Sequence, residues 1–156
     1  MRTISLVLSL LTTGLAAGLF YTFSIAVLPG LARVGDRTFV EAMSGINKAI
    51  LNGWFAIAFG GAVVFTAVAA LLHLGGSHRT ALVWIVAALV LYVAQLVITF
   101  TVNVPLNNEL VAVNLDTDDL AAARERFEAT WVRWNVVRTL LVTGAFGSLI
   151  GALLKS

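Results

Sequence analysis

The stretch WVRWNVVR, from Trp131 to Arg138, leads directly into an apolar run that ends at Leu154. This order places Asn135 and Arg138 at, or just inside, the boundary of a membrane span. A guanidinium at membrane depth costs roughly 2.5 kcal/mol or more unless it reaches the headgroups or finds a partner. Arg138 therefore either extends to the membrane surface, as long cationic side chains near helix ends often do, or belongs to a functional site.

The composition of the whole chain is that of a membrane protein. Of the 156 residues, 60% are hydrophobic and 12% are charged, whereas soluble domains are about 45–50% apolar. The net charge of +2 is too small to indicate a nucleic-acid partner, and no basic run accompanies it. Cysteine is absent from the sequence, which excludes disulfides, thiolate metal sites and a cysteine nucleophile.

Apolar stretches that approach or exceed the roughly 20 residues needed to cross a bilayer cover about residues 4–28, 54–74, 81–104 and 135–154. We expect an all-α membrane protein, a single domain over residues 1–156 with four transmembrane helices in an antiparallel bundle. The first stretch is too long for the apolar part of a signal peptide, so we interpret it as a retained span. Both termini and the connection 73–79 then lie on one side of the membrane, and the connections 29–53 and 105–134 on the other.

Each of the two longer connections has the pattern of an amphipathic helix at the membrane interface. Asp36 is a fair N-cap for a helix that carries Phe39 and Met43 on one stripe. Asp116 is a similar N-cap for a second helix, whose apolar face ends at Trp134. We therefore expect two interfacial helices that lie along the membrane or fold back over the bundle.

Orientation and self-association are less well defined by the sequence. Lys and Arg are more numerous on the side of the longer connections, which favours a cytoplasmic location for that side. Several of these residues lie in the amphipathic helices, so the orientation stays open. We expect a multi-pass protein of a bacterial plasma membrane. Small-residue pairs such as Gly14 with Gly18 and Gly147 with Gly151 indicate close helix packing, either within one chain or in a homo-oligomer.

Polar residues follow one face of the third span, where Tyr92, Gln95, Thr99 and Asn103 are spaced by three, four and four residues. Lipid offers them no hydrogen-bond partner, so this face is expected to point into the bundle. Interhelical hydrogen bonding, worth roughly 0.6–2 kcal/mol per contact, would be enough to explain Gln95 alone.

The polar stripe ends on the same side of the membrane as Arg138, just before Pro105, which is expected to end the span. Further polar residues expected at this end are Asn107, Asn108 and Glu109 after the third span, Asn47 and Lys48 in the first long connection, and Tyr21 and Ser24 in the first span. Four separate segments thus deliver polar groups to one end of one bundle. Such convergence is harder to explain by helix packing than a single buried amide would be.

The sequence resembles the anthrone oxygenase-like family of membrane proteins over essentially the whole chain. The resemblance lies in GINKAI with Asn47, in VPLNNEL with Pro105, Asn107 and Asn108, and in WVRWNVVRT with Trp131, Trp134, Asn135, Arg138 and Thr139. It implies a site more strongly than it implies a substrate. The chemistry that it implies is the oxidation of polycyclic anthrones to anthraquinones, which fungal relatives carry out.

Removal of one proton from the acidic methylene of an anthrone gives a carbanion that can itself reduce dioxygen, so the resemblance implies no cofactor. Arg138, with Asn135 and Asn107, would hold the enolate oxygen. Glu109 would be either the base or only the partner of Arg138. The residues expected to bind the substrate are Asn47, Gln95, Asn103, Asn107, Asn108, Trp131, Trp134 and Tyr21, with Phe20 as a further stacking partner.

Metal chemistry is not indicated by the sequence. His73 and His78 lie in a short loop on the opposite side from the polar residues, where no carboxylate is near enough to complete an ordinary ligand set. Histidines in such loops are usually exposed to solvent, and haem ligation by His73 is the remote alternative.

Three classes of function stay open. The protein is a cofactor-independent oxygenase of a lipophilic aromatic molecule, a non-catalytic lipid-binding or small-molecule-binding protein or accessory subunit of a membrane complex, or a purely structural bundle. A cavity beside Arg138 would distinguish the first two from the third. An Arg138 that faces lipid or solvent, with no Asn or Glu partner, would contradict a site of any kind.

Overall fold

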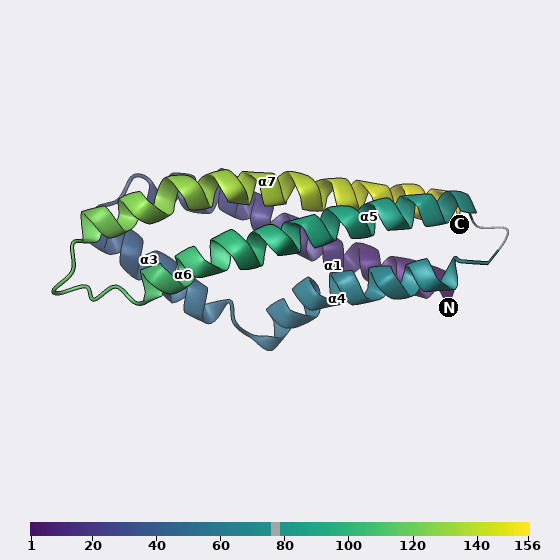
Figure 1. The fold of residues 1–156 in the computed structure, drawn as a ribbon, viewed down its shortest axis with the longest axis horizontal. Helices are drawn as coiled ribbons and strands as arrows, with labels where there is room; N and C mark the ends of the chain where they lie inside the picture. Colours follow the sequence, from purple (N-terminus) through teal and green to yellow (C-terminus); the bar gives the residue numbers. More distant parts are fainter. Residues whose placement is uncertain (76–78) are drawn as a thin grey trace.

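The computed structural model describes residues 1–75 and 79–156, and in these residues the chain is helical with no strand. The helices that are long and apolar enough to cross a membrane are Arg2–Leu31, Gly53–Leu72, Arg79–Val111 and Leu120–Leu154, with mean hydropathies from 1.7 to 2.6. They lie along one another in an elongated bundle that has both chain termini at one end (Figure 1). The predicted four-helix membrane fold is confirmed.

Two of these helices widen into a π-helical turn shortly before a proline. Helix α1 (Arg2–Thr22) continues through the π-turn η1 (Phe23–Val27) into α2 (Leu28–Leu31). Helix α5 (Arg79–Ile98) continues through the π-turn η3 (Thr99–Asn103) into α6 (Val104–Val111). Proline has no N–H to donate and its ring crowds the preceding turn, and the wider turn accommodates it. The expectation that Pro105 ends the span is therefore wrong, because the helix runs on to Val111.

The last helix, α7 (Leu120–Leu154), is continuous over 35 residues. A separate interfacial helix that begins after Asp116 is therefore a wrong prediction, since no proline interrupts this stretch and its first glycine is Gly144. The N-cap is Asp119, whose carboxylate accepts a hydrogen bond of 3.0 Å from the backbone N–H of Ala122.

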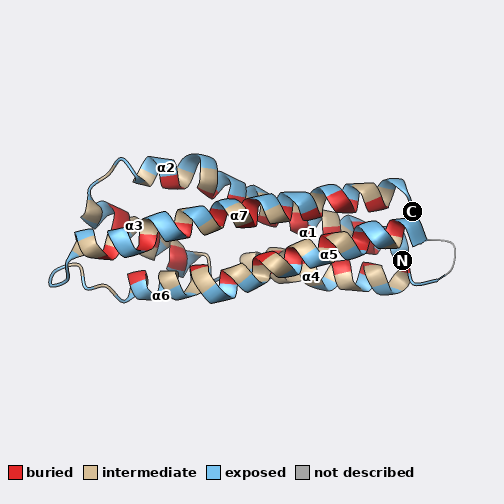
Figure 2. Ribbon diagram, turned by 45° about the horizontal axis from the view of Figure 1, so that its top comes forward, coloured by how far each residue is buried: buried red, intermediate tan, exposed pale blue. Residues whose placement is uncertain are grey.

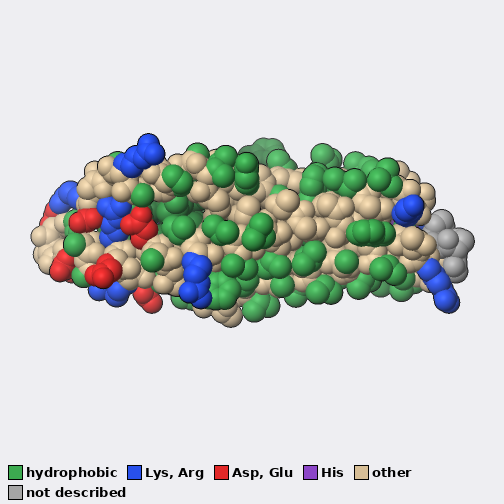
Figure 3. All heavy atoms as spheres, turned by 90° about the horizontal axis from the view of Figure 1, so that it is seen from above, with side chains coloured by type: hydrophobic (Ala, Val, Ile, Leu, Met, Phe, Trp, Pro, Cys, Tyr) green, Lys and Arg blue, Asp and Glu red, His purple; other side chains and the backbone are tan. Residues whose placement is uncertain are grey.

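The other connection contains a separate helix, α3 (Asp36–Ala49), that buries Phe39 and Met43. Phe39 meets Phe127 of α7 edge-on, with ring centroids 6.0 Å apart. Arg124 of α7 fixes the start of α3, because it pairs with Asp36 at 3.0 Å and also donates to the Val34 carbonyl at 2.8 Å. Charged side chains gather at this end of the molecule, whereas the long middle of the same face is hydrophobic (Figure 3).

Helix α4 (Gly53–Leu72) completes the bundle, in which α1 packs on α4 and α7, and α5 packs on α7 and α4. Buried residues face the interior along all four helices (Figure 2). Glycine allows two of the close approaches within the chain. A Cβ added at Gly14 would lie 3.1 Å from the Phe146 ring, and one added at Gly151 would lie 3.0 Å from the ring of Trp84.

Candidate functional site

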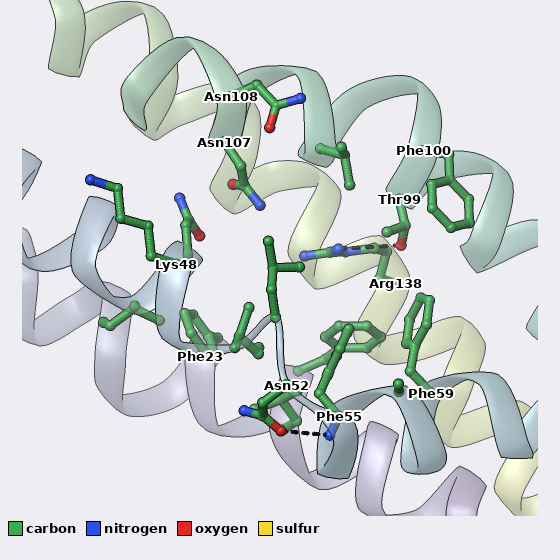
Figure 4. A pocket seen from close by; sticks show the side chains of 18 of the residues that line it. Phe23, Lys48, Asn52, Phe55, Phe59, Thr99, Phe100, Asn107, Asn108 and Arg138 are labelled. Carbon is green, nitrogen blue, oxygen red and sulfur yellow. Dashed lines mark hydrogen bonds between the residues drawn. The ribbon is translucent and has the colours of Figure 1, made fainter. Parts of the chain in front are cut away.

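A pocket with a cavity volume of about 770 Å³ lies at the point where α4 begins, between α1, α3, η3, α6 and α7 (Figure 4). This volume is within the usual range for small-molecule sites. Its aromatic lining consists of Phe20, Phe23, Phe55, Phe59, Phe100 and Trp131, and its polar lining of Asn47, Lys48, Asn52, Thr99, Asn107, Asn108 and Arg138. Both π-turns contribute to the wall, in agreement with the frequent occurrence of such turns at functional sites.

Arg138 is the buried cation of this pocket, with 4% of the residue exposed. Its two terminal nitrogens donate to the hydroxyl of Thr99 at 3.3 Å and to the side-chain oxygen of Asn135 at 2.8 Å. Its Cζ atom lies 4.5 Å from the ring centroid of Phe20 and 5.2 Å from that of Trp131. The third nitrogen, Nε, is buried and has no hydrogen-bond partner in the described chain. Arg138 thus faces neither lipid nor solvent. It lines the cavity, and each of its terminal nitrogens has a second N–H group beyond the one used in these hydrogen bonds.

No carboxylate balances this charge in the parts of the chain that the structure describes. The ion pairs there involve Arg37 and Arg124, and no Asp or Glu lines the pocket. Glu109, expected near Arg138, is exposed and lines a separate hollow beside Arg126. Successive residues of a helix are about 100° apart, so Glu109 lies about 200° round α6 from Asn107 and faces away from the pocket. Its expected pairing with Arg138 is wrong.

Asn135 holds Arg138 in place from behind the pocket. Its side-chain nitrogen donates to the Phe20 carbonyl at 3.1 Å and to the Ser24 hydroxyl at 2.9 Å, while its oxygen accepts from Arg138. Both N–H donors of this amide and one of the two acceptor positions of its oxygen are therefore used within the protein. Asn135 is not among the residues that line the cavity, so its contribution is to position the guanidinium.

The polar stripe of the third span points into the bundle as expected, since Gln95, Thr99 and Asn103 are all buried. Thr99 donates to the oxygen of Gln95 at 3.1 Å and accepts from Arg138, so its hydroxyl is oriented by both neighbours. Asn103 donates to the Trp131 carbonyl over 3.4 Å. Gln95 and Asn103 lie behind the pocket wall and do not line it, whereas Thr99 does.

Asn47, Asn107 and Asn108 line the end of the pocket formed by α3 and α6. The indole N–H of Trp131 donates to the side-chain oxygen of Asn107 at 2.7 Å. Because its oxygen is held in this way, Asn107 presents its NH₂ group, which points into the pocket in Figure 4. Asn47 is 9% exposed, and its buried side-chain nitrogen has no partner in the described chain.

Two expected aromatic residues lie outside the pocket. Tyr21 is 55% exposed, because the neighbouring Phe20 takes the inward direction. Trp134 is only partly buried and stacks against Arg133 instead. The aromatic lining of the pocket also contains two residues that were not expected from the sequence, Phe55 and Phe59, which stack with centroids 4.9 Å apart. Their spacing of four at the start of a span, directly after Asn52, was the available signal.

The expected exposure of the histidines is wrong for His73, which is 1% exposed at the end of α4 with its Nδ1 atom 2.7 Å from the Ala69 carbonyl oxygen. His78 lies outside the described residues. In residues 1–75 and 79–156, no group of three His, Cys, Asp or Glu side chains is placed to hold a metal ion.

The fold and the pocket define a class of small four-helix membrane proteins in which a buried arginine stands at the wall of an aromatic cavity. The chain belongs to the anthrone oxygenase family, whose family model matches residues 52–148. The matched segment includes Thr99, Asn107, Trp131 and Arg138, whereas the α3 residue Asn47 precedes it. Comparisons with curated proteins and with solved structures find no match to the chain.

Proposed function

We propose that the protein is a cofactor-independent oxygenase that binds a flat lipophilic molecule of the anthrone type in this pocket. The observation that carries the proposal is Arg138, a buried cation that lines an aromatic cavity and whose described partners are neutral. A guanidinium in that state stabilises an anion brought next to it, because few competing charges and little water screen the interaction.

The phenylalanine rings and Trp131 provide the surface on which a polycyclic ring system would stack. Phe20 and Phe59 meet edge-on with centroids 6.3 Å apart, and Phe59 stacks on Phe55. Rings in offset or edge-on contact contribute about 0.5–1.5 kcal/mol per pair beyond the area they bury. This wall would place the oxygen of an anthrone against Arg138, where the oxygen becomes negative as the substrate ionises.

The reaction then proceeds with the protein as an electrostatic catalyst. The methylene carbon of the substrate loses a proton to water, and the resulting enolate is held by Arg138. The carbanion passes electrons to dioxygen and forms a C–O bond, which gives a hydroperoxide after protonation. Loss of the second methylene proton and cleavage of the O–O bond produce the quinone carbonyl and water. One dioxygen is consumed for each anthraquinone formed, and one of its atoms enters the product.

Non-catalytic binding is the second candidate. It is favoured by the lack of any carboxylate among the described residues that line the pocket, because general-base catalysis by a positioned side chain typically contributes 10²–10⁴-fold. A carrier needs only the rings and the donors. An oxygenase of the proposed kind needs a substrate that is acidic enough to lose its proton to solvent once Arg138 stabilises the anion.

The test is anthraquinone formation from anthrone under air by the purified protein in nanodiscs. The comparison is with Arg138→Met and with Glu109→Gln, a matched control because Glu109 is exposed and lies outside the pocket. The proposal expects acceleration over spontaneous oxidation that Glu109→Gln retains and Arg138→Met loses, with one atom of ¹⁸O₂ in each product. Anthrone binding without any acceleration would instead support the carrier.

A further inference from the structure

The pocket lies where one of the four long helices is shorter than the other three. Helix α4 has 20 residues, whereas the other helices long enough to cross a membrane have 30, 33 and 35. At a rise of 1.5 Å per residue, α4 is about 30 Å long, which is the thickness of the hydrocarbon core of a bilayer. The end of α4 is level with the start of α1, because Arg2 donates to the Leu72 carbonyl at 2.7 Å. We therefore expect Gly53, the first residue of α4, to lie at the opposite surface of the membrane.

Neighbouring aromatic residues agree with this depth. Trp54 follows Gly53 and is largely exposed, and tryptophan is enriched at the boundary between hydrocarbon and headgroups. Phe59 comes six residues after Gly53, which is about 9 Å further along the helix. Its ring meets that of Phe20, over which the Arg138 guanidinium lies. The Arg138 end of the pocket is therefore inside the hydrocarbon layer.

The border of the pocket between α4 and η3 is exposed and apolar. Leu51, Gly53, Ala56 and Phe100 all line the pocket and are all exposed, and we call these four residues the mouth. The Phe100 ring is 62% exposed and meets Phe59 edge-on, with ring centroids 6.5 Å apart. In the described chain, α4 packs closely on α1 and α5 and has no comparable packing on η3 or α6. Figure 4 shows Phe59 and Phe100 at the same end of the cavity as Arg138.

The border between α3 and α6 is different, because these two helices are held together. Ser44 of α3 donates to the Leu110 carbonyl of α6 at 3.2 Å, and Met43 and Leu110 belong to one buried cluster. Lys48 and Asn108 are the exposed lining residues on this side. The Lys48 ammonium is directed away from the cavity (Figure 4). The border with the least packing across it is thus the mouth, at the depth of the membrane.

We propose that ligands enter and leave the pocket sideways from the bilayer, through the mouth, and that Phe100 is the gate. The inference rests on the proposed binding of a lipophilic molecule in this pocket, and it assigns the source of that molecule. A flat apolar ligand leaves water for the hydrocarbon layer, because burial of its surface is favourable, so it is most concentrated in front of the mouth. The Phe100 ring turns aside as the ligand passes, and the ligand then lies beside Arg138.

The test uses introduced thiols, because the sequence contains no cysteine. Phe100→Cys and Leu51→Cys place a thiol on either side of the mouth, and Asn108→Cys places one on the α6 side of the pocket. Val93→Cys is the matched control. Val93 is exposed and lies outside the pocket, and it precedes Phe100 by seven residues, so it is on nearly the same face of α5. Each variant is labelled with benzyl methanethiosulfonate in phosphatidylcholine vesicles.

Release of anthraquinone into an excess of empty vesicles is followed by the fluorescence of Trp131, after Trp54, Trp84 and Trp134 are replaced by phenylalanine. Unlabelled Phe100→Cys should release anthraquinone about 2- to 10-fold faster than the parent protein, because the ring contact with Phe59 is lost. The label at position 100 or 51 should slow release about fivefold or more relative to the unlabelled variant, because it crowds the path. The label at position 93 should change release by less than about twofold.

A second probe tests the source of the ligand. A phosphatidylcholine that carries anthraquinone at the end of a six-carbon acyl chain cannot leave its leaflet. It should still quench Trp131 and lower the apparent affinity for free anthraquinone, because the mouth opens to that leaflet. Failure of this lipid to compete with free anthraquinone would overturn the lateral mouth. Labels at Phe100 and Leu51 that slow release no more than the label at Val93, or less than the label at Asn108, would overturn it as well.

The outcomes also separate this inference from the proposed function. Competition by the tethered probe and slow release from the labelled mouth, in a protein that does not accelerate anthrone oxidation, would support the lateral mouth and count against the oxygenase. Acceleration of anthrone oxidation, with release controlled at Asn108, would overturn the lateral mouth and leave the oxygenase standing. Failure of anthraquinone to bind at all would contradict both.

Discussion

Replacement of Arg138 by methionine should separate the role of the guanidinium in function from its role in stability. Methionine keeps an unbranched side chain of similar length and removes the charge. The variant loses the 2.8 Å hydrogen bond to Asn135 and the longer one of 3.3 Å to Thr99. Hydrogen bonds to charged groups contribute about 1.5–3 kcal/mol each, and the longer contact belongs at the low end of that range.

The substitution also removes a buried charge, and this change raises the free energy of unfolding. Burial of a charged group costs several kcal/mol even after the protein relaxes around it, and in the described chain no carboxylate offsets the burial of Arg138. The two effects are of similar size. We therefore expect the free energy of unfolding to change by less than about 1 kcal/mol, in the way that replacement of buried charged groups by apolar ones is often neutral or stabilising.

The same substitution should lower the rate of anthrone oxidation about 10²- to 10³-fold, the usual effect of removing one donor to a developing oxyanion. Stability is measured by thermal unfolding followed by circular dichroism in detergent, and rate by anthraquinone absorbance in nanodiscs. A large loss of activity with little loss of stability is the expected signature. The opposite result would be a free energy of unfolding lowered by more than about 3 kcal/mol, with the oxidation rate of the folded fraction unchanged. Arg138 would then stabilise the fold and have no role in the reaction.

Three further substitutions test other parts of the structure. Trp131→Phe removes the N–H that orients Asn107, so KM should rise about fivefold, the equivalent of about 1 kcal/mol, with kcat unchanged. Initial rates over a range of anthrone concentrations measure both constants. A fall in kcat alone would contradict the role of Trp131 in orienting Asn107. Arg124→Met leaves the carboxylates of Asp36 and Glu128 without their partner. It should lower the free energy of unfolding by about 1–3 kcal/mol and leave turnover unchanged. Thermal unfolding and rate assays on the same sample measure the two effects. Gly151→Val places methyl groups against Trp84 and should cost about 1–3 kcal/mol through overpacking, whereas an unchanged melting temperature would mean that the two helices separate easily at this point.

The fold could be predicted because the length of an apolar run is a direct consequence of bilayer thickness. The polar end of the bundle could be predicted for a related reason, since Asn135 and Arg138 are too costly at that depth to stand alone. The ends of the helices were harder to predict from the sequence. Asp116 and Asp119 are equally good N-caps by residue type, but in the folded chain Asp116 pairs with Arg37 and Asp119 caps α7.

The direction of individual side chains could not be predicted where the helix leaves its regular period. Glu109 follows the π-turn η3, which adds a residue to the turn and shifts the phase of everything after it. The residue type of an aromatic side chain also does not indicate whether its ring faces lipid or a pocket. Trp54 is 84% exposed while the adjacent Phe55 lines the cavity, and no property of the two residues alone distinguishes them.

The two π-turns give this bundle a place where small changes of length alter the pocket and leave the spans unchanged. Removal of one residue from η3, such as the exposed Thr101, would return that turn to the ordinary α-helical pitch and rotate α6 by about 100° relative to α5. Asn107 would leave the cavity and another side chain of α6 would enter it, while the packing of α5 on α7 would stay as it is. Evolution can therefore exchange the set of groups offered to a ligand by single-residue insertions and deletions, without the loss of any apolar residue that holds the helices in the membrane.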